Sequence, residues 1–158
     1  MRWRSLFAGV IWMLAFALLA GCGGGSSRLS ASAYRARLAT LAREADKAQG
    51  NVEKALSAKN IAEIQTGLKA FATAEDRLGD EVGRLKPPKD AVAANAELAR
   101  GEHDTASDVR RVLPKIEKLT SAKAALAFLQ QQSGSAKGGR ELDDALSKLK
   151  KLGYTKGS

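Results

Sequence analysis

The sequence has little of what most catalytic and metal-binding sites are built from. Its 158 residues include one cysteine and one histidine, and only 5% of them are aromatic. One cysteine excludes an intramolecular disulfide and a metal site with several thiolate ligands. One histidine excludes any site that needs two imidazoles. The length suits a single domain, and the scarcity of catalytic side chains disfavours an enzyme.

Long apolar stretches are also scarce, and the longest lies near the start of the chain. Arg2 and Arg4 precede an uncharged run over residues 6–20, which is followed by small residues. A positive start, a short apolar segment and a small-residue site are the parts of a secretory signal peptide. A permanent transmembrane helix is the disfavoured alternative, because a span needs about 20 apolar residues. A glycine-rich segment, and not a basic stop signal, also follows the run.

The residues that close this segment are Leu19, Ala20, Gly21 and Cys22. They resemble the lipobox of bacterial lipoproteins in composition, spacing and position, and the resemblance covers only this N-terminal part of the chain. It implies cleavage between Gly21 and Cys22 and transfer of a diacylglyceryl group to the Cys22 thiol. Each buried methylene contributes about 0.8 kcal/mol, so two or more acyl chains anchor a protein stably. The expected location is the cell envelope, on the extracytoplasmic side of the cell membrane.

The sequence predicts four parts. Residues 1–21 are the signal peptide, and residues 22–29 are the lipidated cysteine with a glycine- and serine-rich tether. A coil of that length spans roughly 15 Å. Residues 30–153 form a helical bundle domain with a linker at about 133–139, and residues 154–158 are a tail.

Apolar residues recur at steps of three or four from about residue 30 onward, which is typical of amphipathic helices. The spacing predicts helices over about 30–58, 60–86, 88–119, 122–132 and 140–152. The residues expected to face the core are Tyr34, Leu38, Leu41, Ala45, Ala48, Val52 and Leu56 in the first helix and Ile61, Ile64, Leu68, Phe71, Leu78, Val82 and Leu85 in the second. They are Val92, Ala96, Ala99, Ala106, Val109, Leu113, Ile116 and Leu119 in the third, Leu126 and Leu129 in the fourth, and Leu142, Ala145, Leu146, Leu149 and Leu152 in the last.

No segment alternates as a strand would. The expected fold class is therefore all-α: an antiparallel bundle of about four to five helices. Leu, Ile, Val and Phe make up about 19% of residues 22–158, which is near the level where disorder becomes the alternative. The many alanines favour thin, closely spaced helices.

Two of the predicted helix ends have alternatives. A turn at 58–60 gives the first two helices matched lengths, and Asn60 and Glu63 have the side chains of a capping box. A turn at Gly50-Asn51 is the alternative, with arms of unequal length. Pro114 predicts a kink or a short break near Val112-Leu113 in the third helix.

The second helix is expected to end at the proline pair Pro87-Pro88, with Pro88 able to sit in the first turn of the third. Thr120-Ser121 is expected to cap the fourth helix. Gly153 suits a left-handed stop after the last one.

The single histidine lies in a group of metal-ligating side chains formed by Glu102, His103, Asp104 and Asp108. A metal site in a bundle typically uses Glu-x-x-His pairs on facing helices, and residue 100 is an arginine. We therefore expect His103 to be a partly buried or surface residue and not a ligand. His103 is also the only ordinary base for a serine nucleophile. No catalytic residue, metal or cofactor is predicted.

Charge is unevenly distributed along the chain. Loss of Arg2 and Arg4 with the signal peptide lowers the formal charge from +9 to +7. Residues 22–59 carry seven basic and three acidic side chains, and residues 120–158 carry the same numbers, whereas the segments between them are nearly neutral. The basic residues that precede the first acidic one are Arg28, Arg35, Arg37 and Arg43. We expect contacts between these arginines and an anionic surface, either lipid headgroups or wall polymers; the alternative is an ordinary solvated helix.

These observations favour a lipid-anchored, non-enzymatic envelope lipoprotein whose helical module binds a protein partner or an envelope polymer near the membrane. Nucleic acid, the usual partner of so basic a protein, is disfavoured by export. The alternative is an envelope lipoprotein that binds a small ligand or a metal, with a conceivable apolar pocket between Tyr34, Phe71 and Phe128.

Overall fold

The computed structural model describes residues 28–132 and 136–155, and its regular elements are all helices. The predicted signal peptide and the residues that resemble a lipobox, Leu19, Ala20, Gly21 and Cys22, lie outside the described residues. The elements in order are α1 (Ala31–Ser57), α2 (Ile61–Arg84), the short 3-10 helix η2 (Lys89–Ala91), α3 (Val92–Ile116), α4 (Ala122–Gln132) and α5 (Lys137–Lys151). The expected all-α bundle is confirmed.

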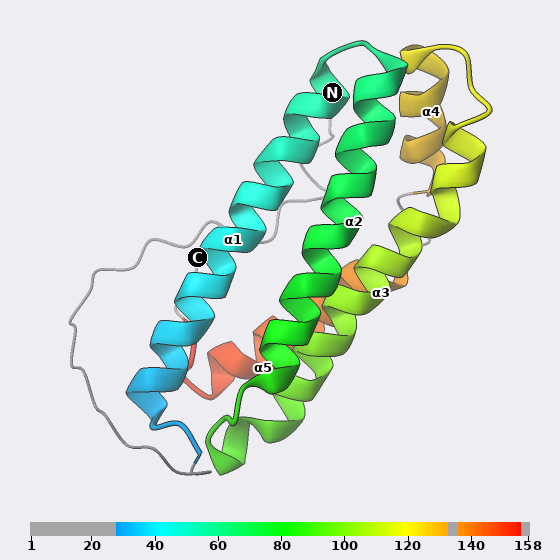
Figure 1. The fold of residues 1–158 in the computed structure, drawn as a ribbon. Coiled ribbons are helices and arrows are strands. Elements are labelled where there is room, and N and C mark those ends of the chain that lie inside the picture. The colour runs from blue at the N-terminus through cyan, green and yellow to red at the C-terminus, as the bar shows by residue number, and fades with distance from the viewer. Residues whose placement is uncertain (1–27, 133–135, 156–158) are drawn as a thin grey trace.

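The three long helices run antiparallel to their neighbours in chain order (Figure 1). α2 packs against α1 on one side and against α3 on the other, and α5 packs along α3. The short α4 lies at the end of the bundle where α1 ends and α2 begins (Figure 1). In the described part of the chain, no helix is both long and apolar enough to cross a membrane.

The bundle contains two separate clusters of buried side chains. The first, which we call the proximal core, joins α1, α2, α3, α5 and the segment after α5. The second, the distal core, joins α1, α2, α3 and α4. The proximal core is formed by Tyr34, Leu38, Leu41, Leu78, Val82, Ala91, Ala94, Leu98, Ala99, Ala145, Leu149 and Tyr154, and the distal core by Ala48, Val52, Leu56, Ile64, Leu68, Phe71, Leu113, Ile116 and Ala125.

The first two helices form the hairpin that the matched lengths predict. The turn falls at Ala58–Asn60, where Lys59 has a φ of 54°, and Gly50 lies inside α1. The Asn60 side chain accepts a hydrogen bond from the Ala62 amide, which supplies the expected cap. Further along the chain, Ser121 caps α4 in the same way by accepting from the Ala124 amide.

Of the kink or short break expected near Val112-Leu113, the break is wrong, because α3 continues through Pro114 to Ile116. Pro114 stands close to the end of the helix, so only one late hydrogen bond of the ladder lacks its donor. Val112, Leu113 and Ile116 are all buried. Packing of this last turn against the rest of the bundle therefore offsets the cost of the proline.

The expected linker at 133–139 extends too far, because α5 begins at Lys137. The Asp108 side chain on α3 accepts hydrogen bonds from the Lys137 and Gly138 amides, at 2.6 and 3.0 Å. A Cβ at Gly138 would lie 2.2 Å from the Thr105 amide nitrogen. Glycine here does not loosen the chain; it lets the first turn of α5 lie against α3.

Two predicted core faces are partly wrong. Val92 and Ala96 are exposed, whereas Ala94 and Leu98 in the first turns of α3, and Ala91 at the end of η2, are buried. The reason is that α3 packs against both α2 and α5, and the face between these two helices passes through Ala94 and Leu98, with Val92 and Ala96 beside it. Leu152 is also exposed, because α5 ends at Lys151 and the chain turns away at Gly153, whose φ is +76°.

Candidate functional site: the basic end of the bundle

Three chain segments far apart in sequence meet at one end of the bundle. The Leu29 amide donates to the Lys86 carbonyl at 2.7 Å, and the Arg28 guanidinium donates to the Pro87 carbonyl at 3.1 Å. The Tyr154 hydroxyl, after α5, donates to the Asp90 carboxylate at 2.9 Å. We call residues 28–37, 84–92 and 148–155 the proximal end. Residues 52–66 and 112–125, at the opposite end of the same helices, form the distal end.

A buried network of polar side chains fixes the proximal end. The Tyr34 hydroxyl donates to the Asn95 side-chain oxygen at 3.0 Å, and the Asn95 amide donates to the Val82 carbonyl at 3.0 Å. The Tyr34 and Tyr154 rings meet edge to face, with centroids 5.1 Å apart. Burial raises the pKa of the Tyr34 hydroxyl well above its usual value. Tyr34 is thus a neutral hydrogen-bond donor that ties α1 to α3.

The two ends differ sharply in charge. The proximal end contains nine basic residues and one acidic residue, Asp90, whereas the distal end contains five basic and three acidic residues. At the proximal end, Arg84 pairs with Asp80 at 3.5 Å and Lys148 pairs with Glu97 at 2.6 Å. The other seven basic side chains there are exposed and form no ion pair with the acidic side chains that the structure describes. They are Arg28, Arg35, Arg37, Lys86, Lys89, Lys150 and Lys151.

The arginines that the sequence singled out do not all lie at this end. Arg28, Arg35 and Arg37 belong to the proximal end. Burial and Asp90 raise the pKa of the Tyr154 hydroxyl, and the positive charge of Arg35 opposes that rise. Arg43 is eight residues beyond Arg35 on α1, or about 12 Å further along the helix. Its guanidinium donates to Thr40. Arg43 is therefore part of the side of the bundle.

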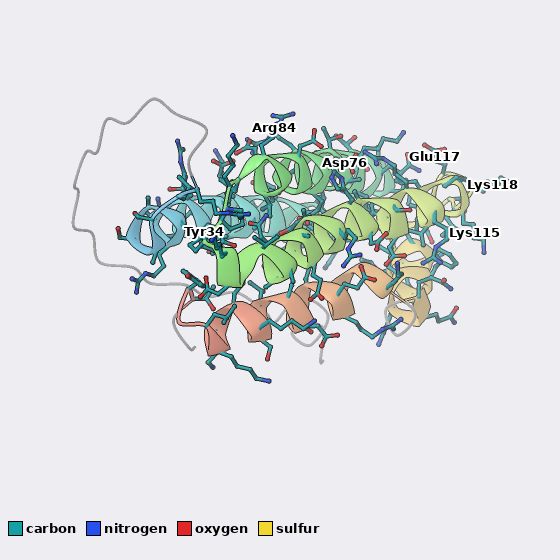
Figure 2. All side chains as sticks on the ribbon, turned by 90° about the horizontal axis from the view of Figure 1, so that it is seen from below. Tyr34, Asp76, Arg84, Lys115, Glu117 and Lys118 are labelled. Atoms are coloured by element: carbon teal, nitrogen blue, oxygen red, sulfur yellow. The ribbon has the colours of Figure 1, made fainter. Side chains whose placement is uncertain are left out.

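Sequence reasoning missed Lys86, Lys89, Lys150 and Lys151 as members of this surface. The sequence shows that these lysines lie near the ends of predicted helices. It does not show that the end of α5 lies beside the start of α1, because no pattern within one helix contains that information. Figure 2 shows how far apart the two ends lie: Tyr34 is at one extreme of the bundle, Lys115, Glu117 and Lys118 are at the other, and Asp76 lies between.

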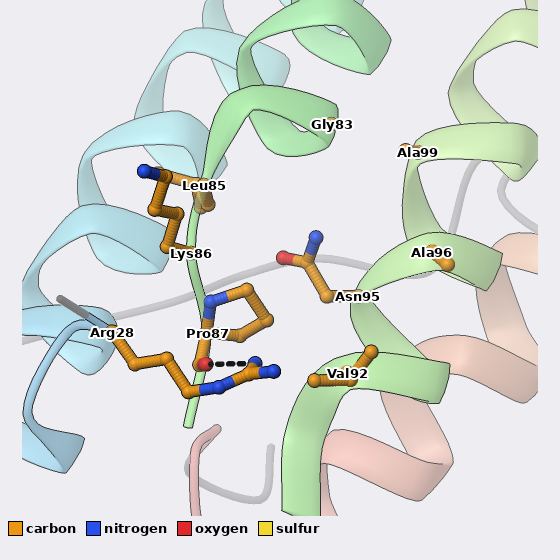
Figure 3. Close-up of a pocket in the computed structure, with 9 residues that line it drawn as sticks. All are labelled: Arg28, Gly83, Leu85, Lys86, Pro87, Val92, Asn95, Ala96 and Ala99. Atoms are coloured by element: carbon orange, nitrogen blue, oxygen red, sulfur yellow. Dashed lines mark hydrogen bonds between the residues drawn. The ribbon is translucent and has the colours of Figure 1, made fainter. Parts of the chain in front are cut away.

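A cleft of about 530 Å³ opens beside the proximal end. Figure 3 shows Arg28, from the segment before α1, and Lys86, from the connection after α2, on one side of the cleft, and Val92 and Asn95 of α3 on the other. Cationic side chains therefore border a hollow with a mainly apolar lining. The lining residues are Arg28, Gly83, Leu85, Lys86, Pro87, Val92, Asn95, Ala96 and Ala99. The pocket expected between Tyr34, Phe71 and Phe128 is wrong, because Tyr34 is in the proximal core, whereas Phe71 is in the distal core and Phe128 packs against it.

Two buried glutamates face each other between α2 and α3, and sequence reasoning missed their pairing. Glu75 is 4% exposed and Glu102 is 8% exposed, and their carboxyl groups share a hydrogen bond. One carboxyl must be protonated to donate that bond. Burial raises the pKa of both groups, and the neighbouring Glu75 raises the pKa of Glu102 further. In the sequence, Glu75 only interrupts the apolar stripe of α2. The stripe of one helix does not show that Glu102 on α3 lies opposite.

The remaining polar residues of α3 point to different neighbours. The His103 ring lies 3.3 Å from the Asp76 carboxylate, which also pairs with Arg110. Hydrogen bonds from Arg110 and His103 hold the pKa of Asp76 below its usual value. Asp104 pairs with Lys137 on α5 at 2.9 Å. Among the residues described, no group of three or more His, Cys, Asp or Glu side chains is arranged to hold a metal ion.

Comparison with known proteins adds no relative: no family model, no curated protein and no solved structure matches the chain.

Proposed function

We propose that the chain is a lipid-anchored, non-enzymatic lipoprotein of the bacterial cell envelope, and that its helical bundle binds a protein partner or an envelope polymer near the membrane. The observation that carries the proposal is the position of the basic charge. Arg28, six residues after Cys22, donates a hydrogen bond to Pro87 at the proximal end, and that end contains nine basic residues and one acidic residue.

Chain length supports an anchor at this end. Six residues span at most about 22 Å even when fully extended, whereas α1 alone, with 27 residues, is about 40 Å long. A lipid on Cys22 would therefore keep the proximal end within about 22 Å of the bilayer. The tether is too short to allow the distal end to take its place while the proximal end points away. The sides of the bundle and the distal end remain for a partner.

The anchor is tested by metabolic labelling with a fatty acid that carries a detectable tag. We expect the wild-type chain to take up the label and to sediment with membranes, with the mass of the mature product starting at Cys22. The Cys22→Ser variant should do neither, and Ser26→Ala, a matched change in the tether, should behave as wild type. An unlabelled wild-type chain with residues 1–21 intact would overturn the proposal.

Partner binding needs its own experiment. Crosslinking in intact cells followed by purification of the anchored protein should recover the same protein or polymer from repeated preparations. The His103→Ala variant should recover it equally, since we assign no chemistry to that ring. Recovery of nothing above the level of an unrelated lipoprotein would contradict the binding role.

The cleft favours a second candidate, an envelope lipoprotein that binds a small ligand. Arg28 and Lys86 at its border suit an anionic group, and its apolar lining suits a short hydrocarbon. Thermal unfolding of residues 22–158 with Cys22→Ser, against a panel of anionic metabolites, distinguishes the two. A midpoint that rises with one ligand and not in the Arg28→Gln variant would favour this candidate.

A further inference from the structure

The exposed apolar side chains are found where the exposed basic ones are. The large apolar residues with the most exposed side chains in the described part are Val92 and Leu152, each 41% exposed. Val92 borders the cleft and Leu152 follows α5, so both belong to the proximal end. At the distal end, the large apolar side chains that the structure describes are buried or partly buried, and the charge is mixed.

Basic side chains interspersed with exposed apolar ones are the chemistry of a surface that lies on a membrane interface. Lysine and arginine attract anionic headgroups, and each such residue near the surface strengthens binding about fivefold. Apolar side chains enter the boundary between headgroups and acyl chains. A soluble anionic polymer would use the basic residues but would give Val92 and Leu152 nothing to contact.

We propose that the proximal end is a docking surface for anionic lipid headgroups, and that the bundle stands on the membrane with its helices pointing away from it. Arg28 before α1 and Arg35 in its second turn, Lys86 and Lys89 from the α2–α3 connection, and Lys150 and Lys151 from α5 contact headgroup phosphates. Val92 and Leu152 insert beside them. The inference rests on the proposed function only for the tether, since the docking surface belongs to the bundle itself.

The contacts already described make this surface rigid. The hydrogen bonds from Leu29 to Lys86 and from Tyr154 to Asp90 hold the three segments in one arrangement. The Asp90 carboxylate, the one acidic group of this end, accepts a hydrogen bond from the neutral Tyr154 hydroxyl and forms no ion pair with the basic side chains that the structure describes around it. A preformed surface loses little conformational entropy on binding.

The test uses residues 22–158 with Cys22→Ser, so that no lipid contributes, and vesicles of phosphatidylcholine alone or in equal mixture with phosphatidylglycerol. We expect binding to the mixed vesicles and little to the neutral ones. The triple variant Lys86→Gln, Lys89→Gln, Lys151→Gln should bind the mixed vesicles about 100-fold more weakly. The control triple variant Lys54→Gln, Lys59→Gln, Lys118→Gln has the same net charge and changes only the distal end, and it should bind nearly as wild type.

Equal loss in the two triple variants would overturn the proposal, because it would show attraction to net charge alone. Equal binding to neutral and mixed vesicles would also overturn it. Replacement of Leu152 by serine should weaken vesicle binding severalfold without changing binding to a soluble polyanion such as polyglutamate. Tight binding to polyglutamate with none to the mixed vesicles would assign the surface to a polymer instead.

Orientation is tested with a fluorophore on Ser32→Cys, at the proximal end, or on Ser57→Cys, at the distal end, both exposed in the structure. A quencher attached to headgroups should reduce the emission of the first and not of the second. Equal quenching would mean that the bundle lies on its side. A chain that docks this way but takes up no fatty acid in cells would overturn the anchor and leave the docking surface standing.

Discussion

The proximal core contains two tyrosines whose hydroxyls donate hydrogen bonds, Tyr34 to the buried Asn95 and Tyr154 to Asp90, whereas the distal core consists of aliphatic side chains and phenylalanine. Apolar packing has no preferred direction, so several arrangements of the same side chains with similar total volume stabilise a core almost equally. Hydrogen bonds between buried side chains allow one arrangement, because an unpaired buried group costs free energy. The proximal half, where three segments distant in sequence meet, is thus the half whose side chains form directional hydrogen bonds.

Ile116→Ala should cause the largest loss of stability, because Ile116 is fully buried in the distal core. We expect the free energy of unfolding to fall by about 2–5 kcal/mol, measured by urea denaturation followed by circular dichroism. Leu152→Ala, at the exposed proximal position, should cost less than about 1 kcal/mol. Equal losses at the two sites would mean that the distal cluster is not a packed core.

Tyr34→Phe tests whether the stability of the proximal half depends on directional hydrogen bonds as well as on the volume of its packed side chains. The change keeps the ring but leaves the Asn95 side-chain oxygen without its donor, so we expect a loss of about 1–3 kcal/mol. Tyr154→Phe removes a bond to the more exposed Asp90 and should cost less. In a double-mutant cycle, Tyr34→Phe and Asn95→Ala should be coupled by at least about 0.5 kcal/mol; additive losses would break the contrast between the halves.

The carboxyl pair between the halves predicts an unusual dependence of stability on pH. Because the folded state raises the pKa of Glu102 above its ordinary value of 4.5, the folded chain keeps a proton that the unfolded chain loses. The stability that depends on this proton is complete below pH 4.5 and is lost as the pH rises through the folded-state pKa. Glu102→Gln keeps a donor for Glu75 without a titrating proton.

We therefore expect Glu102→Gln to flatten the fall of stability with rising pH and to be more stable than wild type in alkaline solution. Unfolding free energies measured across neutral and alkaline pH check this. Glu63→Gln, an exposed glutamate on α2, should leave the wild-type profile in place. A wild-type stability that rises over the same range would show that the two carboxyls are not paired.

Asp108→Ala should have the smallest effect, confined to the docking of α5. The change removes the acceptor for the Lys137 and Gly138 amides, and loss of such a cap costs about 1 kcal/mol. Hydrogen exchange should quicken at those two amides and in the first turn of α5, while the α1–α2 hairpin keeps its protection. Asp143→Ala, on the exposed face of α5, should change neither.

Much of the fold could be predicted because its signals are local. The core stripes of α1 and α2, the turn near Lys59 and the left-handed stop at Gly153 follow from periodicity and from backbone preference. The candidate surface was only half predicted. Arg28, Arg35 and Arg37 were identified by their place in the chain, but the lysines of the α2–α3 connection and of α5 join them only through the packing of α5 on α3.

The sequence alone determined that the chain is helical, where the long helices turn and which stripes are buried, because 3.6-residue periodicity and capping act within a few residues. Only the tertiary structure decided that Lys137–Gly139 is helix, that Glu75 has a buried carboxyl partner and that basic residues from three segments form one end. Each of these depends on a group contributed by another helix: the Asp108 carboxylate, the Glu102 carboxyl and the Asp90 acceptor for Tyr154. Contacts between residues so far apart in the chain arise from packing, which no local pattern encodes.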